Sequence, residues 1–316
     1  MNEMHPTDRD RQWDILEKLA TEGLKEQRRA RRWGLFFKLF FVIYLLVGLG
    51  LFVWQQDAID PVGRHTALVD LRGVIGTDQD VESEAISDAL NTAFENSDTA
   101  GVILRINSPG GSPVHSGHIN AEIQRLRQHY PDTPLHTVVT DVCASGGYYV
   151  AVASDNIYAD KASIVGSIGV VMDGFGFVDA MQKLGIERRL IAAGKYKGML
   201  DPFSPLDSAV ETHTRALVDQ VHQQFIDTVK KGRGDRLSED PDIFSGLFWT
   251  GERALELGLI DGFGTAKSVA RDVIGAEKIV NYTPQGGWLE RFAKQMGATI
   301  AKTIEIDTRF QFSRFR

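Results

Sequence analysis

The chain has 316 residues, enough for one large domain or two smaller ones around a substantial core. Its formal net charge of −7 argues against a general nucleic-acid-binding protein, because such a protein needs a basic face. Since Cys143 is the single cysteine, an intrachain disulfide is excluded and the core alone must stabilise the fold.

The N-terminal region contains one long apolar segment. Residues 34–54 read GLFFKLFFVIYLLVGLGLFVW, about the ~20 residues that a helix needs to cross the hydrocarbon layer. Its only charge, Lys38, lies near the start, and Trp33 and Trp54 lie at the ends, where interfacial aromatic residues are favoured. The cluster RRARR precedes the segment. The positive-inside rule therefore predicts a cytoplasmic tail over residues 1–32, a transmembrane anchor over 33–54, and the rest of the chain across the membrane.

Two other interpretations of the apolar segment are less favoured. A buried core helix is disfavoured because the segment is apolar on every face. A cleaved signal peptide is disfavoured because the preceding region is too long and no small-x-small cleavage site follows Val53. We expect an uncleaved anchor, followed by a linker over residues 55–65.

The following region alternates between strand and helix patterns. Strands are predicted at residues 66–75, 101–109, 135–142, 157–160 and 187–193. Helices are predicted at residues 81–96, 112–130, 146 onward, 177–184 and 207–231. In the second helix Val114, Ile119 and Ile123 are expected to face inward. This alternation predicts one α/β layered domain of βαβ units over residues 66–282. Residues 283–316 form a C-terminal extension with an amphipathic helix at 288–304.

Three glycine-marked corners follow predicted strands. NSPGGS, residues 107–112, would bring backbone N–H groups close to a ligand, although many ordinary turns look the same. Ser145 in the second corner, Ser145-Gly146-Gly147, is either a simple helix N-cap or a nucleophile exposed on a strand-to-helix turn. With such a nucleophile, the Gly111 and Gly146 amides would form an oxyanion hole. Ser167 marks the third corner, IVGSIGV, which could equally be a tight buried turn.

A serine nucleophile needs a base, and the residues alone leave its identity open. The histidines, among them His115, His118, His136, His213 and His222, lack a neighbouring motif that would orient them. A lysine amine acts as a base near neutral pH only when its pKa falls from about 10.4 toward about 7–8, as burial among apolar groups favours. The candidates are Lys195 and Lys197, in GKYKGMLDPF, and Lys161.

The four ordered motifs NSPGGS, ASGGYY, VGSIGV and GKYK followed by PF resemble the signal peptide peptidase (protease IV) family of serine–lysine peptidases, in its half-length bacterial form. The resemblance covers about Leu68 to Gly264. It implies a fold like that of the Clp protease and crotonase group. It also implies Ser145 as nucleophile, Lys197 as general base and Ser167 as the group that orients the lysine. Gly111 and Gly146 would form the oxyanion hole, with no metal or cofactor.

The resemblance further implies homo-oligomeric rings in which serine and lysine meet across a subunit boundary. The expected protein is a single-pass protein of the bacterial inner membrane with a periplasmic catalytic domain, a serine endopeptidase that cleaves hydrophobic peptides such as remnant signal peptides. Tyr148, Tyr149, Phe175 and Phe177 are candidates to line its groove. The alternatives are a crotonase-like acyl-CoA hydratase or isomerase, and a non-catalytic membrane-tethered scaffold.

Overall fold

The computed structural model describes residue 29, residues 31–50 and residues 63–284. The chain divides into two compact units, residues 1–62 and residues 63–316, and each is described by itself. In the first unit a 20-residue helix, Arg31–Gly50, has a mean hydropathy of 2.0 and is long and apolar enough to cross a membrane. The last four residues of the expected anchor, most of the expected linker and the expected helix at 288–304 lie outside the described residues.

The second unit is built on an eight-stranded sheet in the order β6-β5-β3-β2-β1-β8, with β4 beside β3 and β7 beside β4. Every strand pair is parallel except β5–β6, so the predicted α/β class is confirmed. The strands are β1 (His65–Ile75), β2 (Thr99–Gly111), β3 (Leu135–Ala144), β4 (Asn156–Ala159), β5 (Ile164–Gly166), β6 (Phe248–Thr250), β7 (Gly262–Phe263) and β8 (Ile279–Asn281).

The helices connect these strands. They are α2 (Ser83–Glu95), α3 (Pro113–His129), α4 (Gly146–Ala151), α5 (Val178–Lys183), α6 (Ser208–Arg233), α7 (Gly251–Glu256) and α8 (Ala266–Ser268), with 3₁₀ turns η1 (Gly234–Arg236) and η2 (Pro241–Phe244) and a short π-helix, η3 (Val269–Ile274).

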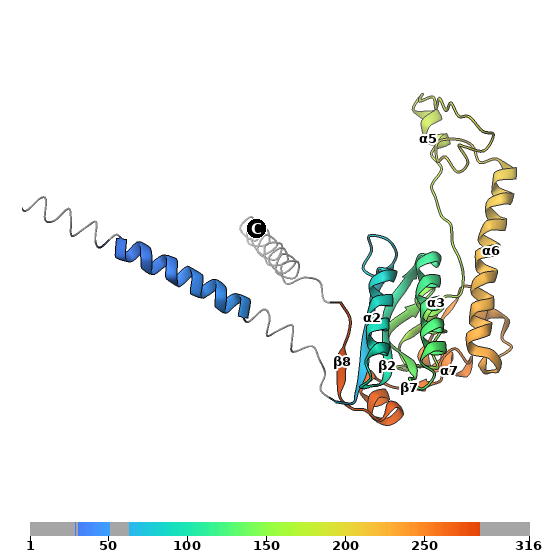
Figure 1. Cartoon of the computed structure of the whole chain (residues 1–316). Helices are drawn as coiled ribbons and strands as arrows, with labels where there is room; N and C mark the ends of the chain where they lie inside the picture. Colours follow the sequence, from blue (N-terminus) through green and yellow to red (C-terminus); the bar gives the residue numbers. More distant parts are fainter. Residues whose placement is uncertain (1–28, 30, 51–62, 285–316) are drawn as a thin grey trace, which may run out of the picture. The chain divides into compact units, whose positions relative to one another are not determined.

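Side chains of the central strands point alternately to the two faces of the sheet, and each face has its own hydrophobic core. Val102 and Leu104 of β2 point into the larger core, which α2, α3 and α4 cover, as Figure 1 shows for α2 and α3. Ile103, between them, points to the opposite face, where it packs with Val269 and Ile274 of η3. Because both faces of the sheet are covered, its central strands read as nearly continuous apolar runs.

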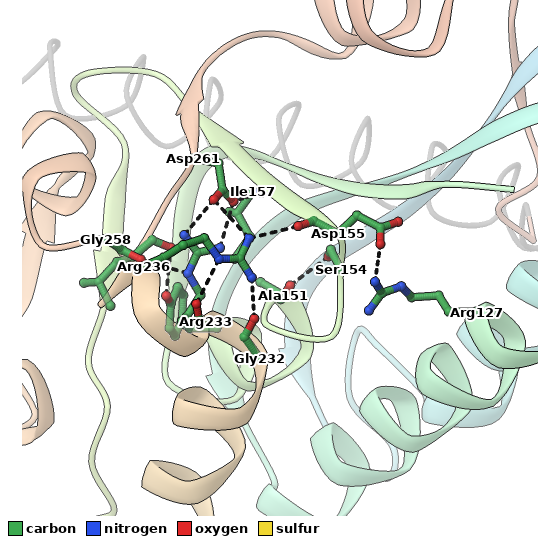
Figure 2. Close-up of polar contacts among 12 residues, drawn as sticks. Arg127, Ala151, Ser154, Asp155, Ile157, Gly232, Arg233, Arg236, Gly258 and Asp261 are labelled. Carbon is green, nitrogen blue, oxygen red and sulfur yellow. Dashed lines mark hydrogen bonds and ion pairs between the residues drawn. The ribbon is translucent and has the colours of Figure 1, made fainter. Parts of the chain in front are cut away.

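The C-terminal end of α6 is fixed to the sheet unit by a buried ion pair. The guanidinium of Arg233, with 1% of its side chain exposed, donates to Asp261 Oδ2 at 2.7 Å and Oδ1 at 2.9 Å, and its Nε donates to the Gly258 carbonyl at 2.8 Å (Figure 2). Phe225 and Val229 on the same half of α6 are buried. This half of the helix therefore keeps a fixed position against the core.

The preceding segment is packed differently. Residues 171–207, here called the arm, contain no buried residue, and Figure 1 shows α5 and its flanking chain beside the N-terminal end of α6, away from the sheet. The strand predicted at 187–193 is wrong: no strand is assigned there, and all seven residues are exposed. Val114 was expected to face inward but is 62% exposed, so it lies on the outward side of the first turn of α3, whereas Ser116 of the same turn is buried. On α6, Leu217 is 38% exposed, although it belongs to the apolar stripe that predicts an amphipathic helix at 207–231, made up of Leu217, Val218, Val221, Phe225 and Val229.

Candidate active site

The first corner begins where β2 and β3 lose their regular register. The pairing shifts between Ile106 and Ser108, and the side chain of Asn107 bridges the gap. Its Oδ1 accepts from the Val142 N–H at 3.2 Å, and its Nδ2 donates to Asp141 Oδ2 at 2.9 Å. Asn107 thus replaces backbone hydrogen bonds at the point where the two strands separate.

Ser108 fixes the irregular end of β2. Its Oγ donates to the Gly73 carbonyl of β1 at 2.6 Å and accepts from the Gly110 N–H at 3.1 Å. Gly110 and Gly111 have φ values of 106° and 149°, which side chains disfavour. The NSPGG sequence therefore forms the irregular end of β2, which is tied to both neighbouring strands.

Ser145 occupies the second corner, between β3 and α4. It has φ 50° and ψ −122°, a strained conformation for a residue with a side chain, which costs on the order of 1–3 kcal/mol. Its backbone N–H donates to the Gly166 carbonyl at 2.9 Å. Its side chain makes no capping hydrogen bond to α4, so the ordinary N-cap interpretation of this serine is wrong. The residue is half-buried, and its hydroxyl is not used to cap the helix.

The first two corners are in direct contact. A Cβ atom added to Gly110 would lie 2.7 Å from both the Gly146 amide nitrogen and the Ser145 Cβ. A Cβ added to Gly146 would lie 3.2 Å from the Gly111 amide nitrogen. Only residues without side chains allow this approach. The structure therefore brings Gly111, Ser145 and Gly146 together, and all three line a small cavity of about 40 Å³.

The third corner supports the second through the sheet. Ala144 pairs with Gly166 between β3 and β5. Ser167 also has a positive φ, 53°, and its N–H donates to the Leu247 carbonyl at 2.7 Å. Gly169 and Val170 line the cavity beside Ser145, whereas Ser167 does not.

Within a single chain, the described residues place no lysine at this cavity. Lys197 and Lys195 lie in the arm and are exposed. The Lys195 amine lies 4.9 Å from the centre of the Tyr196 ring. A larger cavity of about 990 Å³ in and beside the arm is lined by Lys195 but not by Lys197. Lys161 lies 3.7 Å from Glu252 in an exposed pair.

The histidines that the sequence offered as bases make structural contacts and do not line the Ser145 cavity. His115 bonds Ser83 Oγ and Thr77 Oγ1, both at 2.9 Å, and thereby ties α3 to the β1–α2 connection. His136 is buried in β3, where burial lowers its pKa. His222 of α6 lies 3.2 Å from the Ile168 carbonyl. No histidine lines the Ser145 cavity in the described part of the chain.

The wall of the cavity includes residues that the sequence did not assign to the site. Val221, Gln224 and Phe225 of α6 lie opposite the corners. Tyr149, expected as a groove residue, lines the cavity, and its ring lies 5.0 Å from that of Phe225. Tyr148 is fully buried and donates to the Leu259 carbonyl at 2.8 Å, so it belongs to the core. The amphipathic pattern of α6 gave Val221 and Phe225 only as apolar packing positions.

Comparison with known proteins identifies a family. The model of peptidase family S49 matches residues 128–279. The chain is 32% identical over 204 residues to "Putative protease slr0021" of Synechocystis sp., covering 64% of this chain and 70% of that protein. It is 30% identical over 214 residues to the chloroplastic serine protease SPPA of Arabidopsis thaliana, covering 66% of this chain and 31% of that protein.

One further relative is named as a transport protein rather than as a protease. The chain is 45% identical over 203 residues to the Na(+)/H(+) antiporter NhaA of Brucella abortus, covering 64% of this chain but 27% of that protein. The chain thus spans about a quarter of the length of that relative, whose name describes a much longer protein. The S49 match, together with the similarity to most of the Synechocystis protein, shows that the chain belongs to peptidase family S49, a family of serine peptidases.

Proposed function

We propose that this chain is a membrane-anchored serine endopeptidase in which Ser145 is the nucleophile and Lys197 the general base. One observation carries the proposal. Ser145 is held at a strained positive φ with a hydroxyl that caps no helix, and its corner is in direct contact with the first glycine corner. Strain of this kind persists at functional sites because the surrounding structure imposes it.

The chemistry assigned to these groups is acyl transfer. The Ser145 hydroxyl attacks the peptide carbonyl while its proton passes to the neutral Lys197 amine. The resulting oxyanion accepts hydrogen bonds from the Gly111 and Gly146 amides, which stabilise charge that the substrate carbonyl does not carry. The protonated amine then gives its proton to the leaving amine, and water hydrolyses the acyl-enzyme with the lysine again as base. Ser167 is proposed to orient the lysine.

We place the meeting of Ser145 and Lys197 at a boundary between two copies of the chain. The arm that carries Lys197 exposes large apolar side chains, among them Val171 at 83%, Phe175 at 79% and Ile191 at 97% exposure. Apolar surface of this extent is typical of protein–protein interfaces. Burial of the arm against a second copy would also remove water from the lysine amine and favour its neutral form. A homo-oligomeric ring would provide such a boundary for every copy.

The proposed substrates are hydrophobic peptides, remnant signal peptides in particular. Among the described residues the helix Arg31–Gly50 could anchor the chain in the membrane where such peptides remain. The arginine-rich sequence before it supports a cytoplasmic N-terminus and a periplasmic catalytic domain in the bacterial inner membrane. Within the cavity Tyr149 and Phe225 would supply apolar contacts to the substrate.

The test uses the full chain in detergent, a fluorophosphonate probe and a fluorogenic apolar peptide. The wild type should be labelled and should cleave, Ser145→Ala should do neither, and Lys197→Ala should lose cleavage. Lys195→Ala is the matched control, because Lys195 is an exposed lysine of the same arm, and it should cleave normally. Mixing Ser145→Ala with Lys197→Ala before reassembly should restore part of the activity when the site spans two copies.

Three results would contradict the proposal. Labelling that persists in Ser145→Ala removes this serine as nucleophile. If Lys197→Ala cleaves normally and Lys195→Ala is inactive, Lys195 rather than Lys197 is the general base. A wild type that is inert toward both reagents would favour the non-catalytic scaffold, and turnover of an enoyl-CoA by the same wild type would favour the hydratase alternative.

A further inference from the structure

A buried hydroxyl beside the two glycine corners has no role in the catalytic scheme above. Ser116 lies in the first turn of α3, and none of its surface is exposed. Its backbone N–H donates to the Ser112 carbonyl at 3.0 Å in the usual helical way. Its Oγ has no hydrogen-bond partner among the described residues. A buried unpaired hydroxyl costs about 1–3 kcal/mol, and a serine in a helix can usually avoid this cost by bonding the carbonyl four residues earlier.

The side chain of Ser116 is instead directed toward the second corner. A Cβ atom added to Gly146 would lie 2.5 Å from the Ser116 Oγ and 3.2 Å from the Gly111 amide nitrogen. The hydroxyl therefore fills the space behind the Gly146 Cα, on the side where Gly111 approaches. Ser116 does not line the Ser145 cavity, so it lies behind the two proposed oxyanion-hole residues rather than in contact with a substrate.

We propose that Ser116 is a positioning residue of the oxyanion hole. Its hydroxyl keeps the Gly111 and Gly146 corners at their working separation and turns its O–H dipole toward the negative charge that develops in the tetrahedral intermediate. This proposal rests on the proposed peptidase function, because that charge arises only in acyl transfer.

The Ser116 oxygen has a fixed position, whereas its hydrogen is free to rotate. A hydroxyl hydrogen rotates about the C–O bond, and without a competing acceptor it can follow the local field. A dipole that is already in place when charge develops stabilises the transition state without reorganisation. In the ground state the same hydroxyl only adds an unpaired polar group. Ser116 should therefore lower the stability of the resting protein slightly and favour catalysis.

A purely steric role makes a different prediction. The close contact at Gly146 requires a small residue at position 116, and alanine would fulfil that requirement as well as serine. Ser116→Ala removes the hydroxyl and adds no atom. The substitution consequently separates the contribution of the hydroxyl from that of the packing.

The experiment compares the full-length wild type with Ser116→Ala in detergent. The variant should show a kcat for the fluorogenic peptide that is about 3- to 10-fold lower with KM unchanged, less than the roughly 10²- to 10³-fold loss when a direct oxyanion donor is removed. A peptide aldehyde, which forms a tetrahedral adduct with the serine, should bind more weakly by the same factor. The apparent Tm should be unchanged or higher.

Ser154→Ala is the matched control. Ser154 is another buried serine, but its Oγ donates to the Ala151 carbonyl at 2.7 Å, at the opposite end of α4 from Ser145. This control should lower Tm and leave kcat and aldehyde affinity unchanged. An unimpaired kcat in Ser116→Ala, or a loss of kcat together with a loss of Tm, overturns the positioning role while the wild type still cleaves and is labelled. A wild type that does neither overturns the proposed function and this proposal together.

Discussion

The buried ion pair between Arg233 and Asp261 gives a sharp test of how α6 is fixed against the core. Asp261→Asn keeps the shape of the side chain and removes its charge, which leaves the buried Arg233 guanidinium without a counter-charge. Breaking a buried pair in this way costs about 3–5 kcal/mol. We expect the lower limit, about 3 kcal/mol, because the Gly258 carbonyl still accepts from Arg233 Nε at 2.8 Å and the new amide oxygen can accept one bond.

The expected loss can be measured as a change in melting temperature. For a domain of this size 1 kcal/mol corresponds to about 2–4 °C, so Asp261→Asn should lower the apparent Tm by roughly 6–12 °C. Thermal unfolding of the full chain in detergent, followed by circular dichroism at one scan rate, is the assay. Activity should decline at lower temperature than in the wild type, because Phe225 on the same half of α6 lines the Ser145 cavity.

The pH dependence has a definite sign. Burial favours the neutral acid, but the hydrogen bonds from Arg233 and the Ile157 N–H outweigh it, so the pKa of Asp261 lies below its usual value of 3.8. A carboxylate with a lowered pKa stabilises the fold above its unfolded pKa, and that contribution is lost as the pH falls below about 4. The difference in Tm between wild type and Asp261→Asn should therefore shrink in that range.

The control for this prediction is Asp272→Asn. Asp272 pairs with Arg271 at 2.7 Å, but both side chains are more than half exposed, so its removal should leave Tm unchanged within error. If Asp261→Asn lost no more thermal stability than Asp272→Asn, the assigned role of the buried pair would be refuted.

Two further predictions concern the first corner and the buried histidine. Gly110→Ala should lower kcat about 100-fold without unfolding the protein, because the added Cβ would lie 2.7 Å from the Gly146 nitrogen and displace it; wild-type turnover of the fluorogenic peptide would contradict this. His136→Gln should reduce the loss of Tm between pH 7.5 and pH 5.5. Burial lowers the pKa of His136, so its contribution to stability is present above the unfolded value of 6.5 and is lost as the pH falls; a parallel Tm profile for both proteins would refute it.

The sequence predicted the central sheet well because its strands carry a strong pattern. β1, β2 and β3 are long runs rich in branched apolar residues, and glycine corners mark the ends of β2 and β3. The resemblance implied a fold like that of the Clp protease group, and the layered α/β sheet and the match to family S49 agree with it. The convergence of Gly111 with Gly146 could also be predicted, because the carboxyl ends of neighbouring parallel strands meet at one edge.

Elements that depend on tertiary contacts could not be predicted in this way. The segment ERRLIAA contains apolar residues, but the arm offers it no neighbouring strand, and a lone extended segment is not a strand. β6 is only three residues long and forms because its backbone finds the edge of β5. Phe225 lies 80 residues beyond Ser145 in the sequence and, with Gln224, reaches the cavity only through the packing of α6. No local pattern reports such a contact.

The register shift between β2 and β3 at Asn107 affects how precisely the first and second corners are aligned with each other. Successive residues of a strand are about 3.3 Å apart and point to opposite faces, so sliding one strand by a single position would carry a glycine amide past its counterpart. The Asn107 carboxamide joins β2 to β3 just beyond the point where their regular pairing ends, and so holds the two corners in one alignment. Residues beyond that point can therefore be exchanged while the strands beneath keep their register.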